Sequence, residues 1–139
     1  MIDVVLDTNV LMGALLKGNG PNRRVMRAVI SDPKRFRISY SSQMMAEYED
    51  VLSRPAITAR GLQDEAEALL SLMRTVGREV VPKPVYALMY PDLDDRPFLE
   101  AAVYVNGALV TNNIRDYPFL GVTVLGPEEF LSWLESLGG

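Results

Sequence analysis

A chain of 139 residues, 48% hydrophobic and 23% charged, has the composition of an ordinary globular protein, which excludes a disordered or fibrous chain and predicts one domain over residues 1–139. It contains no cysteine and no histidine, so a metal would have to be held by oxygen ligands. The formal net charge of −4 is not typical of a nucleic-acid-binding protein. Since we find neither a membrane-spanning stretch nor a signal peptide, we expect a cytoplasmic protein with no membrane contact.

The first half of the sequence alternates between strand and helix. Residues 2–7, IDVVLD, are rich in β-branched side chains and predict a strand that is buried on both faces. Apolar residues at helical spacing mark the helices that follow. In chain order we expect a strand at residues 2–7, a helix from Asn9 to the GNGP turn, a helix at about 22–31, a strand at 35–40, and a helix from Ser41 or Ser42 to Pro55.

The second half continues this alternation around one irregular connection. Residues 82–97 hold four of the nine prolines and so cannot form a regular helix throughout. In chain order we expect a helix at residues 63–77, a short strand at 79–81, the connection at 82–97, a helix from about Pro97, strands within 107–113 and 121–126, and a last helix at 127–137.

Strands that alternate with helices predict an α/β fold, a three-layer α/β/α sandwich around a mostly parallel sheet of four or five strands. In such sheets, ligands bind beyond the carboxyl ends of the strands. Asp7 lies at that end of the first predicted strand. It is therefore the first candidate for a functional carboxylate, although capping of the next helix would also explain it.

Glu47 is the second candidate, because it lies beside the apolar stripe of its predicted helix, where an acid is costly unless its charge is compensated. The alternative is a solvated helix edge. The third candidate is the cluster Asp92, Asp94 and Asp95 before a helix start. Capping explains one of these acids easily but three only poorly, and a bound cation commonly relieves such repulsion.

Polar residues also follow the strand predicted within 107–113. Thr111, Asn112 and Asn113 end it, and Asp116 comes soon after. These residue types are also plain turn formers, which is the alternative explanation. If this strand lies beside the first one, Asp7, Asn113 and the helix start near Asp95 surround one pocket. Its oxygen ligands suit Mg²⁺ or Mn²⁺, ions that serve the hydrolysis of phosphodiesters.

Four segments, taken in order, resemble the PIN-domain ribonucleases, many of which are toxins of toxin–antitoxin pairs. They are VVLDTNVL, SSQMMAEYEDVL, DLDDRPFLEAA and LVTNNIRDY. None is specific alone, but their order and separation are typical of that family, and they cover nearly the whole chain. The resemblance implies a PIN-like fold, a Mg²⁺- or Mn²⁺-dependent endoribonuclease, an RNA substrate, an antitoxin partner and a homodimer.

The resemblance also assigns roles to residues. Asp7, Glu47 and Asp95 match the three acids with which the family holds its metal, and we expect them to be both catalytic residues and metal ligands. Asn113 stands where a fourth acid is usual; it could ligate a metal but supplies no charge. The residues expected to support this shell are Thr8, Asn9, Asp92, Asp94, Thr111 and Asp116.

RNA could be held by the arginines that open the second predicted helix. Arg23, Arg24 and Arg27 are the candidates, and contacts to phosphates would need no base recognition. The alternative is a solvated helix face. Without the five acids of the expected metal cluster, the net charge of −4 becomes +1, so the acidic total does not argue against a nucleic-acid substrate.

Three other functions are weighed against the nuclease. Asn113 favours a PIN-like scaffold of weak or no activity that binds RNA or a protein partner. A haloacid-dehalogenase-type phosphotransferase needs a second aspartate where this chain has Asn9, and Lys83 is a poor match for its lysine. A receiver domain needs an aspartate after its third strand and a lysine after its fifth, and neither is in place.

Overall fold

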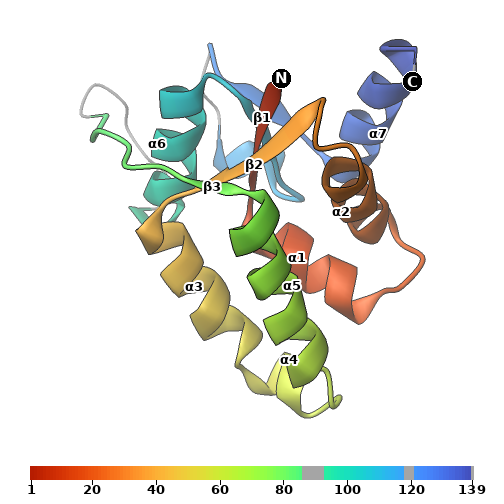
Figure 1. Ribbon diagram of the computed structural model, residues 1–139. Coiled ribbons are helices and arrows are strands. Elements are labelled where there is room, and N and C mark those ends of the chain that lie inside the picture. The colour runs from red at the N-terminus through yellow and green to blue at the C-terminus, as the bar shows by residue number, and fades with distance from the viewer. Residues whose placement is uncertain (86–92, 118–120, 139) are drawn as a thin grey trace.

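The structure, a computed structural model, describes residues 1–85, 93–117 and 121–138. Its strands form one parallel sheet in the order β3-β2-β1-β4-β5 (Figure 1). The strands are β1 (Ile2–Leu6), β2 (Phe36–Tyr40), β3 (Arg78–Glu79), β4 (Ala108–Val110) and β5 (Thr123–Leu125).

Helices cover both faces of this sheet, and Figure 1 shows α6 on one side of it and α2 and α7 on the other. The expected α/β/α sandwich is therefore confirmed. None of the helices in the described part is long and apolar enough to span a bilayer. The helices are α1 (Thr8–Leu16), α2 (Pro21–Ser31), α3 (Ser42–Leu52), α4 (Pro55–Thr58), α5 (Gln63–Val76), α6 (Arg96–Val105) and α7 (Pro127–Ser136), with short 3₁₀ turns at Leu93–Asp95 and Ile114–Asp116.

β1 is the central strand and is buried on both faces, as its sequence predicts. Val4, Val5 and Leu6 have no exposed surface. β1 pairs with β2 on one side and with β4 on the other, so Val4 lies opposite both Ile38 and Ala108. The chain adds β2 and β3 on one side of β1 and then crosses to the other, which makes the carboxyl ends of β1 and β4 the switch point where ligands bind in such sheets.

Helix α3 is fixed to the end of β1 by a side chain that the apolar pattern alone does not explain. The hydroxyl of Tyr48 donates a hydrogen bond to the backbone carbonyl of Leu6, and Tyr48 is fully buried. Its ring packs on Phe98 of α6 at 6.1 Å between centroids. Because Leu6 precedes Asp7, this bond sets the distance between α3 and the candidate site.

Three element boundaries differ from the expectation. Pro55 does not only follow α3; it opens the short helix α4, since proline suits a first helical turn. β3 is shorter than predicted and begins one residue earlier, although the N–H of Val80 still donates to Tyr40 at 2.8 Å. Helix α6 begins at Arg96 after the 3₁₀ turn, one residue before Pro97. Residues 86–92 of the predicted connection lie outside the described residues.

A charged cluster joins β1 to β2 at the end of the sheet away from Asp7. The carboxylate of Asp3 accepts from Nε and Nη2 of Arg37 at 2.8 and 3.3 Å and from the hydroxyl of Ser39 at 3.0 Å, with Arg78 at 3.8 Å. Burial alone would raise the pKa of Asp3, but these hydrogen bonds and the charges of Arg37 and Arg78 lower it below its usual value of 3.8. The carboxylate therefore stabilises the fold above that pH, and this contribution is lost as the pH falls through the lower pKa of the folded state.

Replacing Asp3 by Asn should lower the free energy of unfolding at pH 7 by about 1 kcal/mol, because it removes charge-assisted bonds that water partly screens. Below about pH 4 the difference in the free energy of unfolding between Asp3→Asn and the wild type should become smaller. Urea unfolding at pH 7 and pH 3 measures both values. Asp50→Asn is the control, since Asp50 and its partner Arg54 are 68% and 59% exposed and their pair should contribute little. An equal loss at both pH values would contradict this account of Asp3.

Candidate functional site

Asp7 is a buried carboxylate with a separate role for each oxygen. Its Oδ1 accepts the backbone N–H of Thr8 at 2.8 Å, so Asp7 does cap α1, as one of the two sequence interpretations expects. Its Oδ2 accepts from Thr111 Oγ1 at 2.7 Å, Tyr117 OH at 3.2 Å and Asn9 Nδ2 at 3.3 Å. The side chain thus joins the end of β1 to the segment after β4, and capping accounts for only one of these four hydrogen bonds.

The environment of Asp7 opposes its charge. Asp7 is 7% exposed. Burial raises its pKa, the hydrogen bonds from Thr111, Thr8 and Tyr117 lower it in part, and the negative charge of Asp116 raises it again, so that the net shift is upward. None of the causes of this shift is a positive charge from a described residue, and a bound cation relieves that condition.

Glu47 comes to the same place from α3. The hydroxyl of Thr8 donates to its Oε2, so Thr8 contacts Asp7 through its backbone and Glu47 through its side chain. Partial burial raises the pKa of Glu47, and the charges of Asp7 and Asp94 raise it further against the effect of Thr8. Glu49 and Asp50, its neighbours on α3, are exposed.

Tyr117 shows that the third predicted acid belongs to the same electrostatic environment. Burial, followed by the charges of Asp7 and Asp95 and then of Glu47, raises the pKa of this hydroxyl well above its usual range. Asp95 is half-buried in the 3₁₀ turn before α6, and Asp94 beside it is exposed. Asp92 lies outside the described residues.

The residues after β4 contribute backbone and amide contacts. Thr111 Oγ1 accepts the N–H of Asn113 at 3.0 Å while it donates to Asp7. Asn113 is exposed, and its side chain does not cap the turn that follows. Asp116 is half-buried and close enough to Asp7 to raise its pKa. The predicted supporting residues Thr8, Asn9, Thr111 and Asp116 therefore do surround Asp7.

The chemistry of the site suits a hard divalent cation better than the spacing of its acidic side chains does. Within residues 1–85, 93–117 and 121–138, no group of three or more acidic side chains is arranged to hold a metal ion. The gathered donors are nevertheless all oxygen. Burial and neighbouring negative charges raise the pKa of both Asp7 and Glu47. Carboxylates in that condition are suitable ligands for Mg²⁺ or Mn²⁺.

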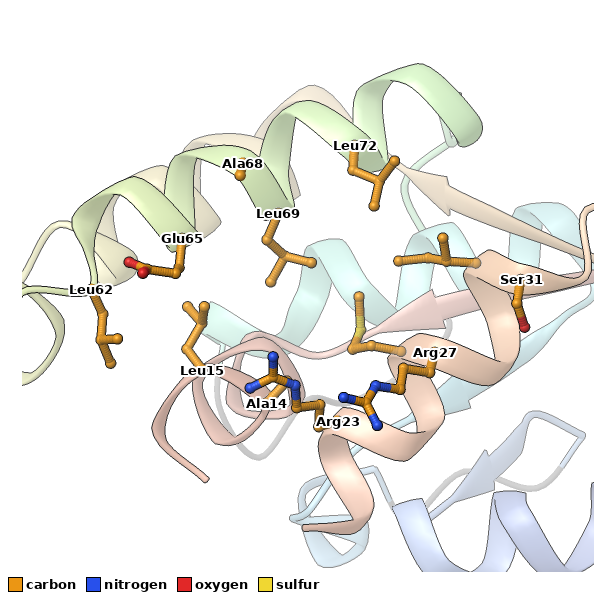
Figure 2. A pocket seen from close by; sticks show the side chains of 12 residues that line it. Ala14, Leu15, Arg23, Arg27, Ser31, Leu62, Glu65, Ala68, Leu69 and Leu72 are labelled. Carbon is orange, nitrogen blue, oxygen red and sulfur yellow. The ribbon is translucent and has the colours of Figure 1, made fainter. Parts of the chain in front are cut away.

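The arginines proposed for RNA binding divide between two environments. Arg23 and Arg27 line an apolar groove of about 680 Å³ between α1, α2 and α5, and Figure 2 shows them across this groove from Leu69 and Leu72. Arg24 is exposed on α2 and is not among the groove residues. A role in RNA binding stays a prediction for all three.

A second pocket, of about 520 Å³, lies beside the elements that carry the acids. Its lining residues include Gln43 from the first turn of α3, Leu93 from the 3₁₀ turn before α6, and Arg96 at the start of α6. Glu47 follows Gln43 by about one helical turn, and Asp95 directly precedes Arg96. Glu47 and Asp95 themselves are not among the lining residues, whereas Glu79 and Glu100 are, and the pocket is wide enough for a small organic group.

Sequence reasoning missed two tyrosines at this site. Tyr48 anchors α3 to Leu6, and Tyr117 donates to Asp7. Each occupies a buried position that phenylalanine could fill, and a buried hydroxyl normally has a hydrogen-bond partner. The signal was thus present in the residue type, but the partner could not be read from the sequence.

Comparison with known proteins agrees with the fold. The family model described as PIN domain matches residues 3–115, which include α3, α6, β4 and all of β1 but Ile2. The fold is similar to that in the crystal structure of VapBC2 from Rickettsia felis, which is bound to a DNA fragment from the VapBC2 promoter. That likeness has a TM-score of 0.61 and 16% identity over 90% of this chain and 98% of the other. No curated protein matches the sequence. On the extent of the family match, the chain belongs to the PIN domain family.

Proposed function

We propose that this protein is a metal-dependent endoribonuclease and the toxin of a toxin–antitoxin pair. The observation that carries the nuclease proposal is that Thr8 joins the buried Asp7 to Glu47 at the switch point of a parallel sheet, with Tyr117 bonded to Asp7 and the charge of Asp95 close enough to affect that tyrosine. Repulsion between the negative charges of neighbouring acids lowers the stability of the fold, and such a loss of stability is typical of functional sites.

Asp7, Glu47 and Asp95 would hold the metal, with Asn113 as a neutral fourth ligand. When bound, Mg²⁺ or Mn²⁺ supplies an activated water and neutralises charge on the scissile phosphate. The chain's own residues orient these ligands: Thr111, Tyr117 and Asn9 fix Asp7, and Thr8 fixes Glu47.

RNA as the substrate, Mg²⁺ or Mn²⁺ as the ion, the homodimer and the cytoplasmic location come from the family resemblance. An antitoxin partner is supported by the likeness to VapBC2, and also by the apolar groove in Figure 2. Leu72 on the groove wall is 40% exposed. Apolar side chains left open to solvent around a groove suit contact with a partner protein.

The second candidate function is a PIN-like scaffold that binds RNA or a protein without cutting. Two observations favour it: the neutral Asn113 at the fourth position, and the absence of a metal-ready group of three acids among the described residues. The two functions make opposite predictions for metal binding.

Asp7→Asn should weaken Mn²⁺ binding by more than about 100-fold and abolish metal-dependent cleavage of single-stranded RNA, because loss of a ligand costs more than loss of an outer partner. Calorimetry and a cleavage assay on the same samples measure both effects. Asp64→Asn is the matched control, since Asp64 is an exposed acid at the start of α5.

The wild type itself can refute the nuclease proposal. If it binds no Mn²⁺ at millimolar concentration and leaves RNA intact, the scaffold is the better explanation. If cleavage persists unchanged in Asp7→Asn, the activity does not arise at this site.

Thr111→Val should preserve the shape of the side chain and remove its hydrogen bond to Asp7. We expect Mn²⁺ affinity and cleavage rate to fall by about 10- to 100-fold, and the free energy of unfolding to fall by about 1–3 kcal/mol because Asp7 loses a buried donor. Thr123→Val on the exposed face of β5 is the control for loss of a threonine hydroxyl. Wild-type metal affinity in Thr111→Val would show that this bond does not orient the ligand.

Toxicity is tested by growth. Induced expression of the wild-type chain in a bacterial host should slow growth, whereas Asp7→Asn expressed to the same level should not, because the harm requires cleavage. If both strains grow normally while the purified wild type cuts RNA, the toxin proposal fails and the nuclease proposal stands.

A further inference from the structure

A chain of side-chain amides connects helix α2 to the carboxylate of Asp7. The Oδ1 of Asn22 accepts from Nδ2 of Asn112 at 2.9 Å. The same Nδ2 and the backbone N–H of Asn112 both donate to Oδ1 of Asn9, each at 3.1 Å. The Nδ2 of Asn9 then donates to Asp7 at 3.3 Å.

The direction of the hydrogen bonds between these amides follows from their donors. Because Oδ1 of Asn9 receives two N–H groups from Asn112, the amide of Asn9 must turn its own NH₂ towards Asp7. Asn112 uses its two side-chain hydrogens for Asn9 and Asn22. Asn22 therefore acts as an acceptor that holds the side chain of Asn112 in place.

Gly13 provides an independent observation that the position of Asn22 is built into the fold. Gly13 lies within helix α1, where glycine is less favourable than alanine. A Cβ at this position would lie 2.2 Å from Nδ2 and 2.7 Å from Cγ of Asn22. The missing side chain is thus the space that the amide of Asn22 occupies.

We propose that Asn22 is a positioning residue for Asp7, which it reaches through Asn112 and Asn9, and that Gly13 is required because it leaves room for Asn22. This proposal rests on the proposed function in so far as Asp7 is a metal ligand. The bonds of Asn112 are exposed to water, so the effect is smaller than that of Thr111, which contacts Asp7 directly.

The test measures Mn²⁺ affinity by calorimetry in a set of variants. Asn22→Ala and Gly13→Ala should each weaken binding by about 3- to 10-fold, below the range for direct partners of a ligand. The double variant should be no weaker than Asn22→Ala, because both changes break the same contact. Asn22→Asp keeps the acceptor oxygen and should bind at least as well as the wild type. Asn19→Ala, an exposed asparagine of the preceding loop, should change nothing.

Two further measurements separate positioning from a loss of stability. The double variant of Gly13→Ala and Asn22→Ala should have a urea midpoint equal to or above that of the wild type, since alanine favours the helix. The Mn²⁺ concentration for half-maximal cleavage should rise in Asn22→Ala, whereas the KM for RNA at saturating Mn²⁺ should not change.

The metal-free protein provides a result that does not depend on the proposed function. In Asn22→Ala, the NMR resonances of the backbone amides of Asn112 and Thr8 should shift, because these amides donate to Asn9 and Asp7. Unchanged resonances in Asn22→Ala would overturn the proposal. If the wild type binds Mn²⁺, an unchanged Mn²⁺ affinity in Asn22→Ala would also overturn it. If the wild type binds no Mn²⁺, the proposed function fails and the resonances alone decide whether Asn22 positions Asp7.

Discussion

The carboxylate of Asp7 is the constraint on which the rest of the site depends. It is buried at the end of the central strand, and it is compatible with the fold only because four donors surround it: the N–H of Thr8, the hydroxyls of Thr111 and Tyr117, and the amide of Asn9. These donors lower the cost of the charge without cancelling it, since the pKa of Asp7 is still raised by burial and by Asp116. The fold thus keeps an acid that is held in place but not neutralised.

The sheet topology explains why these particular groups meet. β1 lies between β2 and β4, and the chain changes sides between β3 and β4, so the carboxyl ends of β1 and β4 lie side by side at the switch point. Tyr48 then ties α3 to Leu6 and brings Glu47 to these strand ends from the helical layer. The site therefore depends on backbone geometry first and on side-chain chemistry second.

Much of this could be predicted from the sequence, because it depends on local pattern. The β-branched run at residues 2–7 gave a buried strand, and the acid at its end followed from the rule for parallel sheets. Asn113 and Asp95 could be placed near it once the two strands were taken as neighbours, and β1 does pair with β4. What could not be predicted depends on contacts distant in sequence. The bond of Tyr48 to Leu6 spans 42 residues and that of Asn112 to Asn22 spans 90. α4 was missed because proline both ends and begins helices.

The bond between Thr111 and Asp7 joins residues 104 positions apart. A ribosome makes Asp7 long before Thr111 and Tyr117, and during that interval the carboxylate has neither of their hydroxyls. β4, which must pair with β1 to bring them into place, is also made late. A nascent chain that ends before Thr111 therefore contains Asp7 and Glu47 but lacks the hydroxyl bonds that hold Asp7, so this site is completed only late in synthesis.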